Sequence, residues 1–219
     1  MTAQLTERAT RTWQADPYAD ALRTGRGPLY LRRRDGWLLP LEVERWCAEA
    51  DAADGTVLAR CAGPVLDIGC GPGRLVAALA RLGNTALGVD LTPEAVDRTL
   101  RAGGDALCRS VFDPLPQEGR WGTVLLIDGN IGIGGDPGAL LRRTAELTAP
   151  GGSLLVEVAD ADVDERVEVY VDNGNGGRGA SFWWARLGTR ALITEAADAG
   201  WTPYGAWQEE GRRFVHLRH

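Results

Sequence analysis

The feature that most constrains this chain is a glycine-rich turn between a short apolar run and a helical segment. The turn reads Gly69-Cys70-Gly71-Pro72-Gly73 and follows the apolar residues 64–68. Glycine lets the backbone bend sharply and approach a ligand closely, and the next helix begins with unpaired N–H groups that attract a polar ligand. The turn therefore predicts a ligand site at the carboxyl edge of a parallel sheet.

The segment 63–158 alternates apolar runs with helical patterns, which predicts parallel βαβ units. We expect strands at 64–68, 85–89, 106–112, 123–127 and 152–158, and helices at 74–82 and 137–147. Thr92 is expected to cap a helix that begins at Pro93. The fold class is therefore α/β with a mostly parallel sheet.

Two further segments flank this unit. Residues 1–62 are expected to form an N-terminal extension that acts as a small helical lid, with no long helix at 13–40 and short helices at 41–50 and 56–61. Residues 63–219 are expected to form the ligand-binding domain, with a substrate insert at about 160–187. Within it we expect a strand at 163–171, a helix at 189–199 and a hairpin of strands 201–208 and 212–217.

Two acidic residues define the class of ligand. Asp90 ends the next strand, where a carboxylate can accept hydrogen bonds from a ribose diol. Asp67 lies just before the turn, where it would repel a pyrophosphate and attract an ammonium group. A dinucleotide fingerprint would also need a small residue where Arg74 stands. The sequence predicts a nucleoside ligand with a cationic or zwitterionic tail and without a pyrophosphate.

Composition excludes several chemistries. All 24 basic residues are arginine, which removes Schiff-base and P-loop lysine chemistry. His216 and His219 are the only histidines, so no multi-histidine metal centre and no metal are expected. A net charge of −6 argues against nucleic acid or an anionic membrane as partner. The absence of a signal peptide, a spanning apolar run or a CxxC pair predicts a cytoplasmic location.

Residues 65–73, VLDIGCGPG, resemble the first motif of the class I S-adenosylmethionine-dependent methyltransferases, and Gly88-Val89-Asp90 resembles the second. Residues 111–116 stand where that family has its adenine-contacting loop, and 126–130 where it has its fourth motif. The resemblance implies a doubly wound seven-stranded sheet of order 3-2-1-4-5-7-6, with strand 7 antiparallel. It also implies S-adenosyl-L-methionine as cofactor and methyl transfer by direct displacement.

The motifs and the residue pattern together give the expected site. The expected cofactor-binding residues are Asp67, Gly69, Cys70, Gly71, Gly73, Asp90, Leu91, Val111, Phe112, Asp113, Asp128 and Gly129. The catalytic candidates are Asp128, either as a base or as a residue that holds the backbone near the cofactor, and Asn130 as a group that orients the acceptor. The expected substrate-binding residues are Tyr18, Tyr30, Trp37, Asn130 and Trp183. Because neighbouring residues on a strand face opposite ways, at most one of Trp183 and Trp184 is expected to contact the substrate.

The expected function is methyl transfer to an oxygen or nitrogen of a small molecule, such as a secondary metabolite, by a monomer or homodimer. Three alternatives stay open. The first is an enzyme of the same fold that uses the cofactor without methyl transfer, the second is a non-catalytic cofactor-binding module, and the third is a nicotinamide oxidoreductase, which Arg74 and Asp67 disfavour. The run Arg32-Arg33-Arg34 is either a solvated stretch or an anion clamp.

Overall fold

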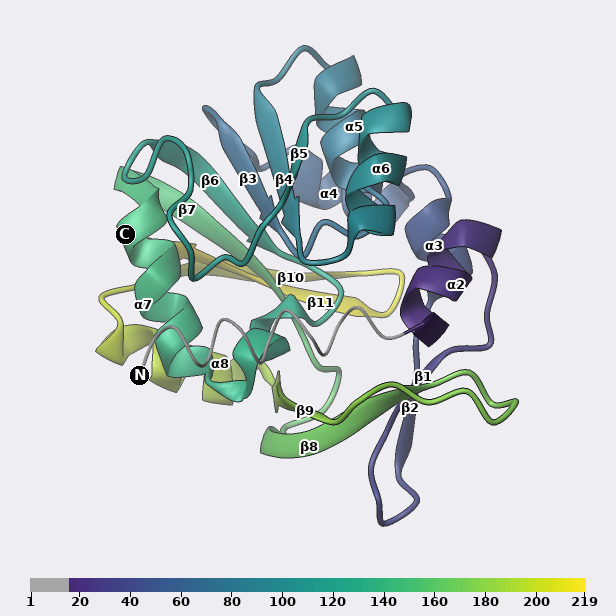
Figure 1. Ribbon diagram of the computed structural model, residues 1–219. Coiled ribbons are helices and arrows are strands. Elements are labelled where there is room, and N and C mark those ends of the chain that lie inside the picture. Colours follow the sequence, from purple (N-terminus) through teal and green to yellow (C-terminus); the bar gives the residue numbers. More distant parts are fainter. Residues whose placement is uncertain (1–15) are drawn as a thin grey trace.

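Two β-sheets organise the computed structural model, which describes residues 16–219 (Figure 1). The larger sheet has the order β10-β11-β7-β6-β3-β4-β5. Its strands are β3 (Val65–Ile68), β4 (Ala86–Asp90), β5 (Ala106–Cys108), β6 (Trp121–Leu126), β7 (Thr148–Val158), β10 (Thr202–Glu209) and β11 (Arg212–Arg218). Strands β5, β4, β3, β6 and β7 are parallel, and β11 runs antiparallel to both β7 and β10. Counted along the chain, this is the expected order 3-2-1-4-5-7-6, so the predicted fold class is confirmed.

Helices cover both faces of the larger sheet. They are α4 (Ala52–Leu58), α5 (Arg74–Arg81), α6 (Pro93–Arg101), the 3-10 helix η1 (Asn130–Gly135), α7 (Pro137–Leu147) and α8 (Thr189–Asp198). Along β6, Val124 and Leu126 pack with α7 and α8, whereas Leu125 packs with α4 and α5. This alternation follows from the period of two in a strand and explains why the central strands are apolar on both faces.

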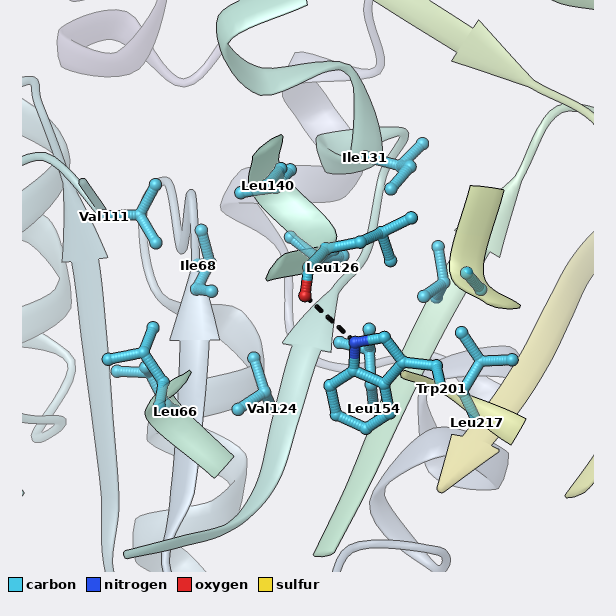
Figure 2. Packing of buried hydrophobic residues seen from close by; sticks show 14 of the residues in the cluster. Leu66, Ile68, Val111, Val124, Leu126, Ile131, Leu140, Leu154, Trp201 and Leu217 are labelled. Atoms are coloured by element: carbon cyan, nitrogen blue, oxygen red, sulfur yellow. Dashed lines mark hydrogen bonds between the residues drawn. The ribbon is translucent and has the colours of Figure 1, made fainter. Parts of the chain in front are cut away.

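The face that packs on α7 and α8 forms the largest core cluster (Figure 2). Trp201 lies in this cluster with 2% of its surface exposed. Its indole N–H donates a hydrogen bond of 3.0 Å to the Leu141 carbonyl oxygen in α7. The buried N–H of Trp201 therefore has a hydrogen-bond partner, as buried polar groups require.

The smaller sheet joins two segments that are far apart in the sequence. It has the order β2-β1-β8-β9, with β1 (Tyr30–Arg32), β2 (Leu38–Pro40), β8 (Asp164–Asp172) and β9 (Phe182–Leu187). Strand β1 pairs antiparallel with β8, so the N-terminal extension and the expected insert share one sheet. A hairpin alone is marginal in water, so each hairpin needs the other to become stable.

One face of the smaller sheet packs against two helices, α2 (Asp16–Thr24) and α3 (Val43–Cys47). Leu22 and Val43 are fully buried in this second core, together with Leu31 and Val171 from the sheet. The first 15 residues of the expected lid lie outside the described residues.

Some expected boundaries in the flanking segments differ from the structure. The helix predicted at 41–50 is only Val43–Cys47, and the one predicted at 56–61 is Ala52–Leu58. Asp51 starts this second helix early, because its carboxylate accepts the Asp54 N–H at 2.7 Å while the Asp54 carboxylate accepts the Asp51 N–H at 3.2 Å. This reciprocal capping box was not recognised in the sequence.

Some strand boundaries and one helix cap in the larger sheet unit also differ from the expectation. The strand predicted at 106–112 ends at Cys108, and β7 begins at Thr148 rather than at 152. Thr92 stands at the predicted N-cap position, but its hydroxyl makes no capping hydrogen bond. Among residues 16–219, no helix is long and apolar enough to span a lipid bilayer.

Candidate active site

A cavity opens where β3, β4 and β6 end, at the carboxyl edge of the larger sheet. Its lining comes from the glycine-rich turn, from the residues after β4 and β6, and from the smaller sheet with its helices. The lining residues are Tyr18, Leu31, Leu41, Trp46, Ile68, Gly69, Cys70, Gly71, Pro72, Arg74, Val89, Asp90, Leu91, Arg109, Ser110, Val111, Asp128, Asn130, Ile133 and Trp184. The cavity therefore lies at the position that the glycine-rich turn predicted.

The glycines of the turn serve different purposes. A Cβ on Gly73 would lie 2.3 Å from the Thr99 hydroxyl, so this glycine permits close packing of α5 on α6 and does not line the cavity. Gly71 faces the cavity, and a Cβ built there would have only the Tyr18 hydroxyl, at 3.7 Å, as a neighbour. Both residues have positive φ, which favours glycine. Gly71 therefore keeps open the space between the turn and α2.

Asp90 is tied to the turn by its carboxylate. One oxygen accepts the Gly71 N–H at 3.0 Å and the other accepts the Thr92 N–H at 2.8 Å. Burial raises the pKa of Asp90 above its ordinary value, and these backbone hydrogen bonds oppose the shift. Each carboxylate oxygen keeps a second lone pair, so Asp90 can also accept hydrogen bonds from a ligand diol.

Asp128 lies among three arginines. Arg74 donates a hydrogen bond of 2.6 Å to one carboxylate oxygen, and Arg45 forms an ion pair of 2.8 Å with the other. Arg212 approaches to 3.5 Å from β11. Burial opposes ionisation of Asp128, but Arg74 and Arg45, with Arg212, outweigh it and hold the pKa below its ordinary value. A carboxylate with a lowered pKa is a weak base.

These arginines belong to a larger buried ion network. Arg74 also donates to Asp54 in α4 at 2.7 and 2.8 Å. Arg212 donates to Asp54 at 2.9 Å and to Glu157 in β7 at 2.9 and 2.8 Å. In the sequence, Arg74 served only as an argument against a dinucleotide-binding fingerprint. In the structure, its ion pairs anchor the helix that follows the glycine turn. Its role was missed because its partners are distant in the chain.

Asn130 contacts the turn from the side of η1. Its side-chain amide donates to the Ile68 and Gly69 carbonyl oxygens, each at 2.9 Å. A Cβ on Gly69 would lie 2.6 Å from this amide nitrogen. The amide donors of Asn130 are therefore used to hold the turn, which leaves only its carbonyl oxygen for a substrate.

Asp67 lies behind the turn, with 3% of its surface exposed. Burial raises the pKa of Asp67 to about 7, against the lowering effect of Arg74 and with further raising effects of Asp128, Asp54 and Asp90. It does not line the cavity. A positive ligand group near the turn would favour ionisation of Asp67.

The opposite wall of the cavity is mostly apolar. Leu31, Leu41 and Trp46 come from the N-terminal segment, Ile133 from η1 and Trp184 from β9. The Trp46 indole N–H is buried and has no hydrogen-bond partner among residues 16–219. Sequence reasoning missed these residues, because pairing between β1 and β8 decides which side chains of the extension reach the cavity.

Several predicted residues line the cavity and others do not. Those brought together are Gly69, Cys70, Gly71, Asp90, Leu91, Val111, Asp128, Asn130 and Tyr18. Those outside the lining are Asp67, Gly73, Phe112, Asp113, Gly129, Tyr30, Trp37 and Trp183. Near the loop that was expected to contact adenine, Ser110 and Arg109 line the cavity and Phe112 and Asp113 do not.

The expected aromatic substrate-binding residues differ most from the cavity lining. Trp183 is 59% exposed, whereas Trp184 is 7% exposed and lines the cavity. Of this pair only Trp184 lines the cavity, because its pairing with Val167 on β8 places it on the core face of the sheet. The Tyr30 ring lies beside Gly174, and Trp37 packs beneath the Arg186 guanidinium, 5.2 Å from its ring centre.

Known proteins resemble this chain in sequence and in fold. A curated relative, the ubiquinone biosynthesis O-methyltransferase of Xanthomonas euvesicatoria pv. vesicatoria (strain 85-10), is 37% identical over 99 residues. That match covers 42% of this chain and 41% of the relative, so the chain spans about two fifths of the length of the curated relatives it matches.

Solved structures share the fold. A SAM-dependent methyltransferase from Bacteroides fragilis in complex with S-adenosyl-L-homocysteine superposes with a TM-score of 0.77 at 20% identity, covering 95% of each chain. The 1,6-didemethyltoxoflavin-N1-methyltransferase of Burkholderia thailandensis gives a TM-score of 0.60 at 21% identity, covering 81% of this chain and 80% of that one. Residues 42–204 match the family described as a methyltransferase domain. The chain therefore belongs to the methyltransferase-domain family, which confirms the resemblance read from its motifs.

Proposed function

We propose that the protein binds S-adenosyl-L-methionine in this cavity and transfers the methyl group to an oxygen or nitrogen of a small molecule. One observation carries the proposal: the same cavity has the glycine turn and Asp90 on one side and an apolar wall on the other. The first side suits a nucleoside with a charged tail, and the second suits an organic acceptor.

The residues fit the cofactor. Asp90 would hold the ribose diol, and Gly71 would let the ligand approach the backbone. A cationic tail near Asp67 would favour the ionised form of that carboxyl group, while Arg74 would lie near the carboxylate of the tail. S-adenosyl-L-methionine brings a methyl group that is already activated on a sulfonium, so alignment of the acceptor is the main task of the protein.

The ion network bears on proton removal. Asp128 is neutralised by Arg74 and Arg45, and no histidine is among the described residues that line the cavity. We therefore expect an acceptor atom that attacks without help from Asp128, such as a neutral amine or an acidic hydroxyl that ionises in water. Asp128 and Asn130 then act as positioning residues for the turn.

The apolar wall defines the acceptor. Trp46 and Trp184 favour a flat, partly apolar molecule, and the unpartnered Trp46 N–H favours one with a hydrogen-bond acceptor. The curated relative is named for O-methylation in ubiquinone biosynthesis, and the Burkholderia enzyme for N1-methylation of 1,6-didemethyltoxoflavin. The proposal therefore includes both an oxygen and a nitrogen as the acceptor atom. The smaller sheet with α2 and α3 would act as the cover of the acceptor side.

We further propose a cytoplasmic monomer or homodimer without a nucleic-acid partner. The net charge of −6 disfavours a polyanionic partner. All four cysteines are free, which agrees with a reducing compartment.

The test combines calorimetry and mass spectrometry. Purified protein should bind S-adenosyl-L-methionine and S-adenosyl-L-homocysteine saturably and should not bind NADH. Incubation with a panel of aromatic amines and phenols should give a product heavier by one methylene together with S-adenosyl-L-homocysteine. No saturable binding of either compound would refute the proposal. Tight binding without turnover on any acceptor would instead favour the non-catalytic module, and cofactor consumption without a methylated product would favour a non-methylating enzyme of the same fold.

A conservative variant tests the acceptor wall. Trp46→Phe keeps the ring and removes the donor, so KM for the acceptor should rise about 3- to 10-fold with little change in cofactor affinity. An unchanged KM would remove the Trp46 N–H from acceptor recognition.

A further inference from the structure

A second hollow, outside the proposed active site, is lined by four arginines. Arg32, Arg33 and Arg34 come from the β1–β2 hairpin, and Arg178 comes from the turn between β8 and β9. Tyr170, Gly36, Gly179 and Ser181 complete the lining. The run Arg32-Arg33-Arg34 is thus joined by an arginine more than a hundred residues away in the chain.

This hollow lies on the opposite face of the smaller sheet from the cavity. Leu31 lines the cavity, whereas Arg32, the next residue of β1, lines the hollow. On β8, Val171 is buried in the core beneath the sheet, whereas its neighbour Tyr170 lines the hollow. Because side chains alternate along a strand, the two sites share one sheet and do not share a wall.

A buried carboxylate fixes two of the arginines. Asp172 has 3% of its side chain exposed, and one of its oxygens lies 3.2 Å from Arg32 Nη1 and 3.3 Å from Arg178 Nε. Its other oxygen accepts the Gly174 N–H at 2.7 Å. The Arg178 guanidinium also lies 5.3 Å from the centre of the Tyr170 ring. Asp172 therefore holds one edge of the Arg32 guanidinium and one edge of the Arg178 guanidinium. This lowers the entropic cost of presenting their other edges to a ligand.

The hollow keeps guanidinium donors without partners. Arg33 pairs with Asp35 at 2.7 Å, but within residues 16–219 no hydrogen bond or ion pair joins the Arg34 side chain to another residue. Among the described residues, the ion pairs of the four arginines use two carboxylates, Asp172 and Asp35, and no carboxylate lines the hollow. The four guanidinium groups therefore exceed the carboxylates that pair with them, in a chain whose net charge is −6.

We propose that this hollow binds a phosphate or diphosphate group. The planar forks of arginine match the several oxygens of a tetrahedral oxyanion. Gly36 lines the hollow without a side chain, and nothing lies within 4 Å of a Cβ built there, which leaves room for such a group. The anion would be either a free phosphate compound or the phosphate end of a larger molecule that docks on this face of the sheet.

The probe is inorganic pyrophosphate, titrated by calorimetry and by thermal melting, with sodium chloride at equal ionic strength as control. We expect saturable binding and a melting temperature that rises with pyrophosphate beyond the chloride control. A phosphate monoester, phenyl phosphate, is the second arm: tighter binding than inorganic phosphate would indicate the phosphate end of a larger molecule, and equal binding would indicate a free anion.

Two variants localise the binding. Arg34→Gln removes an exposed arginine that has no partner among residues 16–219, so folding should be unaffected while pyrophosphate affinity falls about 5-fold. Adding Arg178→Gln should lower it at least about 10-fold further. Arg101→Gln is the matched control, because Arg101 is exposed on α6 far along the chain from the hollow, with only a 4.0 Å contact to Asp97.

An absence of saturable pyrophosphate binding would overturn the proposal. It would also be overturned if Arg34→Gln and the double variant bound pyrophosphate as tightly as the wild type. Affinity for S-adenosyl-L-homocysteine should stay the same in all three variants, because the hollow and the cavity lie on opposite faces. The outcome for pyrophosphate is therefore separate from the outcome for the proposed methyl transfer.

Discussion

At the scale of single residues, two carboxylates near the glycine turn differ because their neighbours differ. Asp128 contacts three arginines and stays ionised, whereas Asp67 is buried without a hydrogen bond from any described residue and has its pKa raised to about 7. Both are aspartates: Asp67 precedes the turn in the sequence, and Asp128 follows β6 and approaches the turn only in the folded chain. The surroundings that the fold creates, rather than residue type, give them different protonation.

The raised pKa of Asp67 predicts a pH-dependent stability. In the unfolded chain Asp67 releases its proton near pH 4, but in the folded protein it keeps the proton until about pH 7. The unfolded state is therefore favoured progressively across this window, so the contribution of Asp67 to the free energy of unfolding should fall by about 2–3 kcal/mol between pH 4.5 and 7.5. Urea denaturation of wild type and Asp67→Asn checks this. The variant should lack this part of the decline, and parallel pH curves for the two proteins would contradict the expectation.

Asp90 gives the second prediction at this scale. Asp90→Ala removes the carboxylate expected to bind the ribose diol, so affinity for S-adenosyl-L-homocysteine should weaken by about 1–3 kcal/mol in calorimetry. Asp97→Ala is the control, because Asp97 is exposed on α6 and has only the distant ion pair with Arg101. Unchanged affinity in Asp90→Ala would remove this residue from the proposed ligand site.

At the scale of elements, a single ion network joins α3, α4, α5, β7 and β11. Arg45, Arg74 and Arg212 meet Asp54, Asp128 and Glu157, and Asp54 is fully buried. Burying charges is costly, so such a network tolerates the loss of one partner poorly. It ties the start of α5 to the terminal hairpin.

We predict that Asp128→Ala lowers the free energy of unfolding by about 3–5 kcal/mol, because it leaves Arg74 and Arg45 partly unpaired in a buried place. Chemical denaturation measures this, and Asp113→Ala serves as a control, since no ion pair involves its side chain among the described residues. A loss in Asp128→Ala no larger than in Asp113→Ala would show that the network contributes little.

The glycine turn gives a second prediction about an element. Gly71→Val should abolish cofactor binding, because the side chain would fill the space between the turn and Tyr18. Gly103→Val is the matched control, since Gly103 also has positive φ but has open space around its Cβ position. The control should show similar backbone strain of about 1 kcal/mol and should keep binding. Retained binding in Gly71→Val would place the ligand elsewhere.

At the scale of the whole molecule, the smaller sheet brings together two distant chain segments that both line the cavity. Residues 30–40 and 164–187 form one sheet, and that sheet contributes Leu31 and Trp184 to a cavity whose other wall is the glycine turn. Figure 1 shows the smaller sheet beside the carboxyl ends of the larger one. The cavity is therefore complete only when both sheets have formed.

This arrangement predicts that ligand binding protects both sheets. Hydrogen exchange with and without S-adenosyl-L-homocysteine should show slower exchange in β1, η1 and β9 as well as around Gly69–Gly73. The β10–β11 turn should not change, because it does not line the cavity. Protection confined to the glycine turn would mean that the smaller sheet does not take part in the proposed site.

The sequence by itself determined the parallel βαβ strands of the larger sheet and the position of the glycine turn, because strand periodicity and turn glycines are local signals. The order of the strands followed from the resemblance of the motifs to a family. Helix α7, for example, has the predicted bounds since Asp136 caps it and Pro137 opens it. The apolar wall, the arginine network and the second hollow were decided only by the tertiary structure. Each depends on pairs such as β1 with β8 or Arg74 with Asp128, and contact between residues so distant in the chain is set by packing of whole elements, which no local pattern encodes.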